Sequence, residues 1–223
     1  METFSNIYVL MAISYASYFI ISYKYNLIKI NSLMDALTSV KAFKLINIKH
    51  LSGILLFGIG FWVYLPDFQF LIINPGFNNP VNSTLLLIIV VLSGFVSKRS
   101  AIKYFADLDT LSIIKPADLI LYFSIRIPFL FFYELFFRGI LLHSSLIYTN
   151  LLGAIFINLV LYTLIHSFNS RKEIIGCIPF GIVLCLFSYY TNSVWPAFLI
   201  HSTFSFMYES TLFKITNLKT QKS

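Results

Sequence analysis

The sequence predicts an all-α membrane protein, a polytopic bundle of about seven transmembrane helices. Of its 223 residues, 58% are hydrophobic and only 11% are charged, and the mean hydropathy is +0.81. Ordinary globular domains contain roughly 25% charged residues, so a chain this apolar is expected to lie within a lipid bilayer. The apolar residues also form long runs separated by short polar connectors, which is typical of helices that each cross the membrane.

Each predicted span is near or above the roughly 17 to 25 residues that cross a bilayer. In chain order, the spans cover residues 5–23, 51–73, 82–97, 119–148, 149–168, 174–191 and 195–213. The fourth is long and contains Pro128, at which a helix could begin. Residues 24–50 mix apolar residues and lysines, which favours an amphipathic helix at the membrane surface over a plain loop. Residues 98–118 are expected to form a second connector of this kind.

The chain is expected to be a single membrane domain, residues 1–223. Its first part, residues 1–118, would hold the N-terminal spans and the amphipathic connectors, and residues 119–213 would hold the functional core. The opening residues, "METFSN", lack the basic region of a secretory signal, so the first span is expected to stay as an anchor. Cys177 and Cys185 lie in one apolar run, too far apart along a helix for a disulfide.

The net charge of +7 is best explained by membrane topology, because the basic residues are confined to certain connectors. Arg126 and Arg138 lie inside the fourth span, and every other Lys or Arg lies in alternate connectors or at the C-terminal end. Because basic connectors stay in the cytoplasm, the N-terminus is predicted to be extracytoplasmic and the C-terminus cytoplasmic. The basic residues would face anionic membrane lipids, and nucleic acid is not expected as a partner.

Ionisable residues inside the predicted spans indicate where chemistry could occur. A charge near the bilayer centre costs roughly 2.5–3.5 kcal/mol, so such residues usually face the interior of the bundle and carry function. The first three spans contain only Asp67, which follows Pro66 and is expected near a membrane edge or a helix break. The last four spans contain the remaining members of this set, Arg126, Glu134, Arg138, His166, His201 and Glu209.

Glu134 and Arg138 are one helical turn apart and can pair on one face. Such a pair either locks the packing of a helix or supports a reactive group. His166 and His201 are each compatible with a hydrogen-bonded packing role. Together with the embedded pair, they also fit a site in which a carboxylate and an imidazole activate water and a second imidazole donates to an oxyanion. For Arg126, the sequence leaves open a packing role or contact with a lipid phosphate. Glu209 lies close enough to the end of its span to reach the membrane edge.

Three motifs in order, "YELFFRG", "YTLIH" and the run "PFGIVLCLFSYYTNSVWPAFLIHSTFS", resemble the CPBP family. These membrane proteins are related to CAAX prenyl proteases and to bacteriocin-processing and immunity proteins. The family pattern is Glu-Glu-x-x-x-Arg, then Phe-x-x-x-His, then His-x-x-x-Asn or Asp. Glu134 matches the second Glu, Arg138 the Arg, His166 the first His and His201 the last His. The resemblance covers about residues 119–207.

Two positions depart from the family pattern, which makes this chain a divergent member. Tyr133 stands where the family has its first Glu, and Ser205 where it has Asn or Asp. The resemblance implies that Glu134 and His166 share the base role, that Arg138 holds Glu134, and that His201 donates to the oxyanion with Ser205 and Tyr133. Tyrosine is a poor base at neutral pH but a competent hydrogen-bond donor.

The resemblance leaves three functions open, and the first two would make the chain an enzyme. The first is peptide hydrolysis on a lipidated or membrane-inserted peptide or lipoprotein, as in the CAAX proteases. The second is acyl transfer in lipoprotein N-acylation, which suits a Gram-positive bacterium of low GC content and its cytoplasmic membrane. The third is a non-catalytic scaffold or immunity protein that binds a partner protein. No cofactor is expected, although Glu134, His166 and His201 have ligand atoms that suit zinc.

Overall fold

The computed structural model describes residues 2–37, 39–104 and 115–220, and within this part the chain is all-helical, without a strand. The predicted fold class is therefore confirmed. The elements are α1 (Glu2–Leu27), α2 (Leu33–Ala36), α3 (Val40–Phe68), α4 (Phe70–Ile73), α5 (Pro80–Tyr104), α6 (Pro116–Glu134), the π-helix η2 (Leu135–Leu141), α7 (Leu142–Leu146), α8 (Leu151–Ile165), the 3₁₀ turn η3 (His166–Phe168), α9 (Arg171–Thr191) and α10 (Trp195–Thr220).

Five stretches of these helices are long and apolar enough to cross a membrane. They correspond to the first and the third to sixth predicted spans, and they run over Ile7–Leu27, Pro80–Lys103, Pro116–Leu146, Leu151–Phe168 and Arg171–Thr191. The last predicted span, 195–213, is helical within α10 but is not among the five, because serines, threonines, His201 and Glu209 interrupt its apolar run. Most of the second, 51–73, is helical within α3, where the side chains of residues 59–66 are not described.

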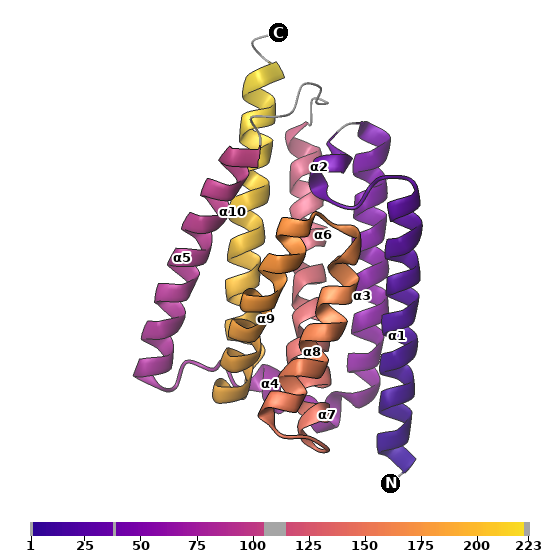
Figure 1. Ribbon diagram of the computed structural model, residues 1–223, viewed down its shortest axis with the longest axis vertical. Coiled ribbons are helices and arrows are strands. Elements are labelled where there is room, and N and C mark those ends of the chain that lie inside the picture. Colours follow the sequence, from indigo (N-terminus) through magenta and orange to yellow (C-terminus); the bar gives the residue numbers. More distant parts are fainter. Residues whose placement is uncertain (1, 38, 105–114, 221–223) are drawn as a thin grey trace.

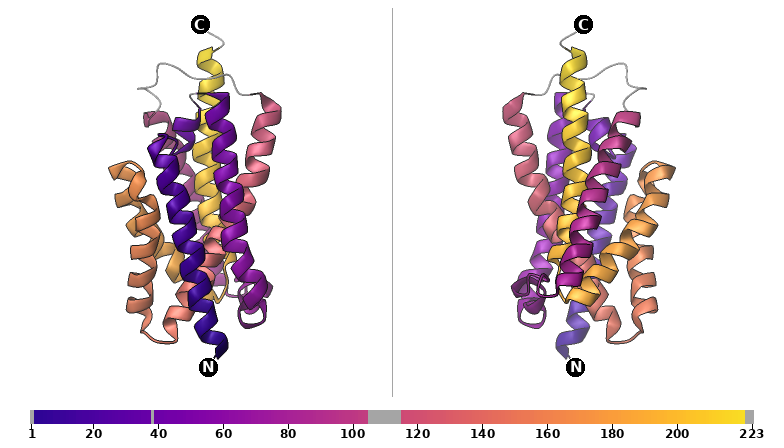
Figure 2. Two further views of the ribbon diagram at one scale, coloured as in Figure 1. Left: turned by 90° about the vertical axis from the view of Figure 1, so that its right-hand side faces the viewer. Right: turned by 90° about the vertical axis from the view of Figure 1, so that its left-hand side faces the viewer.

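The long helices stand roughly side by side along one axis (Figure 1). Helix α1 begins at one end of the bundle, and α10 reaches the other end. Helix α10 packs against α5, α6 and α9, while α3 packs against α1 and α6. Helices α8 and α9 form an antiparallel hairpin on one side of the bundle, which Figure 2 shows edge-on. The tip of this hairpin ends well short of the ends of α1, α3 and α10 (Figure 1).

The first connector differs from the expected single amphipathic helix. Residues 24–50 are divided among the end of α1, the short helix α2 and the first turns of α3. The physical reason is local, because two polar caps start new helices here. Ser32 forms a capping box with Asp35, and the Ser39 side chain accepts a hydrogen bond from the Ala42 N–H. The middle of the second connector, residues 105–114, lies outside the described residues.

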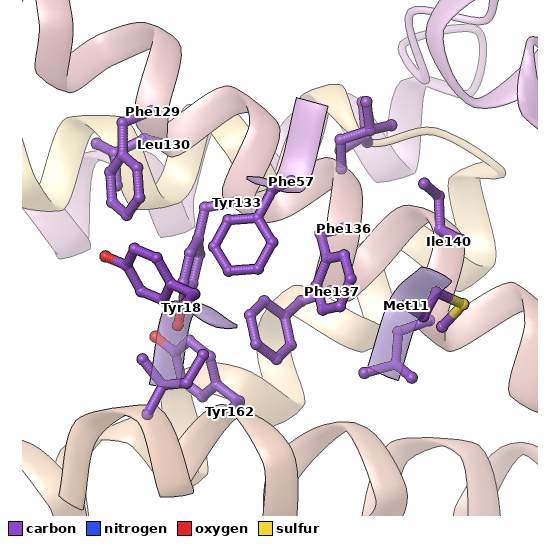
Figure 3. Close-up of a cluster of buried hydrophobic side chains, with 14 of the residues drawn as sticks. Met11, Tyr18, Phe57, Phe129, Leu130, Tyr133, Phe136, Phe137, Ile140 and Tyr162 are labelled. Atoms are coloured by element: carbon purple, nitrogen blue, oxygen red, sulfur yellow. The ribbon is translucent and has the colours of Figure 1, made fainter. Parts of the chain in front are cut away.

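Aromatic side chains fill the centre of the bundle (Figure 3). Phe57 of α3 lies at the middle of this cluster, with ring centroids 4.8 Å from Tyr18 of α1 and 4.7 Å from Phe136 of η2. Tyr133 of α6 lies 4.7 Å from Phe137 and 6.0 Å from Tyr162 of α8. Large rigid rings fill space and contact one another edge to face. The cluster therefore fixes α6 and α8 relative to α1 and α3, and it borders the polar residues described below.

The start of α10 is tied to the chain that follows α3. The Trp195 indole donates to the Ile72 carbonyl at 2.8 Å, and the Val194 N–H donates to the Leu71 carbonyl at 3.0 Å. The Ser193 hydroxyl donates to the Asn74 carbonyl at 2.6 Å. These bonds anchor residues 193–195, which precede His201 by about two helical turns.

Candidate active site

The first part of the site lies on one long helical element formed by α6, η2 and α7. Pro128 lies inside α6 and does not begin a helix, which corrects the expectation that it could. The helix instead changes at Leu135, where it widens into the π-helix η2 over seven residues. Such a widening changes the direction in which the following side chains point, and π segments are frequent at functional sites. Glu134 is the last residue before it, and Arg138 lies within it.

Glu134 and Arg138 form the predicted ion pair in the interior of the bundle. Arg138 Nε lies 3.4 Å from Glu134 Oε2, and both side chains are 0% exposed. The Arg138 guanidinium carbon also lies 4.1 Å from the centroid of the Tyr162 ring, which is a cation–π contact. Opposite charge and the aromatic face offset the cost of burying this arginine. The ion pair that the sequence suggested is therefore present, and the role of Arg138 in holding the carboxylate stays a prediction.

The histidine that contacts Glu134 is His201 of α10. His201 Nδ1 lies 2.5 Å from Glu134 Oε1, which makes a short hydrogen bond between two helices. Because a carboxylate can only accept, the proton of this bond lies on His201 Nδ1. The sequence-based hypothesis gave the base role to Glu134 together with His166. The side chain in contact with Glu134 is the later histidine, and the catalytic roles stay a prediction.

His166 and His201 both lie near Tyr133. His166 Nε2 lies 3.5 Å from the Tyr133 hydroxyl, and His166 Nδ1 lies 3.2 Å from Asn169 Nδ2. The Tyr133 ring centroid lies 6.5 Å from the His166 ring and 6.1 Å from the His201 ring. Tyr133 thus neighbours both histidines, at the position where the family pattern has a carboxylate.

The position of His166 along the length of the bundle follows from the shortness of the α8–α9 hairpin. Helix α8 ends at Ile165, and His166 opens the 3₁₀ turn at the hairpin tip. That tip lies below the ends of the neighbouring long helices (Figure 1), so His166 falls within the height of the bundle. The His166 side chain is partly exposed, whereas Glu134 and Arg138 are fully buried.

Ser205 lies one turn after His201 on α10 and is buried. Its hydroxyl is 3.5 Å from Nη2 of Arg126, at the limit of a hydrogen bond. Arg126 in turn pairs with Glu209, with Arg126 Nη2 2.9 Å from Glu209 Oε1. The sequence had left the partners of Arg126 and Glu209 open, and the structure shows that they are partners of each other.

Sequence reasoning missed three polar residues beside this site. Asn158 of α8 is fully buried, and its side-chain amide donates to the Phe137 carbonyl in η2. Asn169 contacts His166, and His50 of α3 lies with Nε2 3.3 Å from Arg126 Nη1. Asn158 was detectable as a lone amide in an apolar run, two helical turns before His166. His50 carried no such signal, because its contact joins residues far apart in the chain.

No group of three or more His, Cys, Asp or Glu side chains in the described part of the chain lies together as a metal site would require. Cys177 and Cys185 are both free and buried. The polar groups that come together are instead one carboxylate, one guanidinium, two imidazoles and the Tyr133 hydroxyl. Such a set supplies hydrogen-bond donors and proton acceptors inside an apolar bundle.

Fold and site together define a class of protein, a multi-pass membrane protein whose buried Glu, Arg and His side chains meet between helices. Residues 115–207 match the family model described as Type II CAAX prenyl endopeptidase Rce1-like. This match confirms the predicted resemblance to the CPBP family, and it contains Tyr133, Glu134, Arg138, His166, His201 and Ser205. No curated protein and no solved structure gives a significant match to the chain.

Proposed function

We propose that this chain is an intramembrane peptidase of the CAAX-protease class that cleaves a lipidated or membrane-inserted peptide. The observation that carries the proposal is the 2.5 Å bond between His201 Nδ1 and Glu134 Oε1 within the segment that matches a peptidase family. A buried carboxylate bonded to an imidazole is a recurrent device for moving a proton in hydrolysis.

Glu134 and His201 supply the base in this proposal. Because Nδ1 of neutral His201 carries the proton shared with Glu134, Nε2 is the nitrogen able to accept one. A water oxygen attacks the peptide carbonyl carbon, and its proton passes to His201 Nε2. The proton then passes to the leaving nitrogen as the carbon–nitrogen bond breaks. The Glu134 carboxylate stabilises the imidazolium between these steps, and Arg138 holds the carboxylate.

His166 and Tyr133 form the second half of the site. Both lie beside His201 but are not bonded to a carboxylate in the observed geometry. Neutral imidazole and phenol can each donate one hydrogen bond, and such donors stabilise the oxyanion that forms at the carbonyl. This assignment exchanges the histidine roles that the sequence suggested. Ser205 would support Arg126 and lies one turn from the reacting groups.

Separate substitutions test the proposal. Glu134→Gln and His201→Gln are each expected to lower cleavage by about 100-fold or more, because each removes the base. His166→Gln and Tyr133→Phe are expected to cost about 10²–10³-fold, the usual loss for one oxyanion donor. The measurement is mass spectrometry of membrane lipoproteins and lipopeptides from a deletion strain that carries each variant, together with the membrane level of the protein.

Asp67→Asn is the control, because Asp67 is an exposed carboxylate near the end of α3 and lies outside the site. It should behave as the unaltered chain. Full function in the Glu134→Gln and His201→Gln strains at normal membrane levels would exclude catalysis. It would favour the alternative of a scaffold or immunity protein that binds a partner.

One observation favours acyl transfer as a second candidate. Tyr133 replaces a carboxylate and is packed into the aromatic cluster, so only Glu134 remains for proton removal at this point of the helix. Attack by an amine on an ester needs less help from a base than attack by water on an amide. The same mass spectrometry separates the two, because loss of an acyl group and loss of a cleavage give different mass changes. The protein would then act in the cytoplasmic membrane of a bacterium.

A further inference from the structure

A second buried polar cluster lies between α6, α10 and α3, apart from Glu134. Arg126 of α6 holds Glu209 of α10 through two contacts, Nε to Oε1 at 3.0 Å and Nη2 to Oε1 at 2.9 Å. The third member is His50 of α3, whose Nε2 lies 3.3 Å from Arg126 Nη1. Exposed fractions of the Arg126 and Glu209 side chains are 18% and 6%. The pair is therefore largely shielded from water and joins two helices that are far apart in sequence.

The spacing along the two helices relates this cluster to the site. On α10, His201, Ser205 and Glu209 follow one another at intervals of four residues, so they lie on one face. On α6, Arg126 and Glu134 are two turns apart, about 12 Å along the axis. Glu134 bonds to His201, and Arg126 bonds to Glu209. The two helices are antiparallel, so the hydrogen bond and the ion pair follow one another along the contact between them.

Apolar packing by itself would specify the register of α6 and α10 weakly. Side chains of similar size line the contact, with Phe123 next to Phe206 and Phe131 next to Phe198. A slide of one turn, about 5.4 Å, would set Phe206 and Phe198 opposite Leu119 and Ile127 of α6, which are also apolar. The same slide would leave the Arg126 and Glu209 charges unpaired in an apolar interior, which is strongly unfavourable. Setting a register is the best-supported role of buried ion pairs.

We propose that Arg126 and Glu209 are positioning residues that fix the register of α10 against α6 and thereby hold His201 on Glu134. Neither residue needs to touch a substrate. The consequence for catalysis rests on the proposed function, but the positioning itself does not. The positioning role can therefore be tested on the protein without any substrate. A failure of the positioning role would be distinguishable from a failure of the proposed peptidase function.

The test measures the His201 hydrogen bond directly. Full-length protein labelled with ¹⁵N-histidine is placed in lipid nanodiscs, and the His201 signals are assigned by their loss in His201→Gln. In the unaltered chain, we expect a strongly hydrogen-bonded proton on His201 Nδ1. Arg126→Gln and Glu209→Gln should each lose that signal. The exchanged pair, Arg126→Glu with Glu209→Arg, should recover it.

Two further variants make the result decisive. Lys214→Gln removes an exposed cation from the same helix α10 and should leave the His201 signal unchanged. If the single variants do not fold, the neutral double variant Arg126→Gln with Glu209→Gln decides, since it leaves no unpaired charge. Loss of the His201 signal in a folded neutral double variant supports positioning. A retained signal in that variant, or in either folded single variant, overturns it.

Discussion

At the scale of single residues, the environment of Arg138 shows how an ionised side chain is accommodated inside this bundle. Its guanidinium lies between the Glu134 carboxylate and the face of Tyr162, and its side chain is fully buried. Room for it is left by Gly181 of α9, because a Cβ at that position would lie 3.3 Å from Arg138 Nη2 and 2.7 Å from Leu159 Cδ2. The absence of a side chain at position 181 thus allows α9 to approach the arginine closely.

Gly181→Val is expected to destabilise the fold by about 1–3 kcal/mol, because the new methyl groups must displace Leu159 or Arg138. The same substitution at Gly176 provides the control, since a Cβ there meets no atom within 4 Å. Both changes place valine in helix α9, so helix propensity affects them alike. The measurement is the free energy of unfolding in detergent. Equal values for the two variants would contradict the close packing at Gly181.

At the scale of elements, the π-helix η2 is the feature that sets the site geometry. The backbone carbonyls of Phe137 and Arg138 in this segment accept hydrogen bonds from side chains of other helices. Asn158 of α8 donates to the first, and Ser188 of α9 donates to the second at 2.8 Å. The two arms of the α8–α9 hairpin therefore stabilise neighbouring carbonyls of the segment that carries Arg138.

Asn158→Leu tests this support. The leucine fills a similar volume but cannot donate, so the Phe137 carbonyl keeps only its bond from the Leu142 N–H, and loss of the second bond costs about 0.5–1.5 kcal/mol. Thr163→Leu, a partly exposed position on the same helix α8, serves as the control. Unfolding in detergent would measure the difference. An Asn158→Leu protein as stable as the control would show that η2 does not depend on this amide.

At the scale of the whole molecule, the helices place the beginning of α1 and the end of α10 at opposite ends of the bundle (Figures 1 and 2). This arrangement fits an odd number of membrane crossings. The side on which each end lies is a prediction from the basic connectors. Exposed lysines and arginines gather in those connectors, among them Lys24, Lys29, Lys41, Lys98 and Arg171.

Cysteine labelling of intact cells tests this topology. Asn78→Cys is exposed in the connector between α4 and α5, and it should react with a membrane-impermeant maleimide added outside. Arg171→Cys, exposed at the start of α9, should react only after the membrane is permeabilised. The native Cys177 and Cys185 are buried, so the unaltered chain provides the background. The opposite pattern of labelling would reverse the predicted orientation.

The sequence by itself determined the membrane class, the all-helical fold and the family that the core resembles. These follow from composition, from the lengths of apolar runs and from local motifs, which are readable within one segment at a time. It also indicated the pairing of Glu134 with Arg138, because both lie one turn apart on one helix. Glu134, His166 and His201 stand out within their apolar runs, because ionisable groups are costly to bury in a membrane and are therefore rare there.

Only the tertiary structure decided which histidine meets Glu134 and which partner meets Arg126. Both contacts join α6 to α10, and the relative register of two separate helices is set by packing along their whole length. The π-helix is another such feature, because its carbonyls find donors on α8 and α9. A helical period specifies which residues share a face, but it does not specify which face of another helix lies opposite. The pairing of His201 with Glu134 therefore became visible only once α10 was placed against α6.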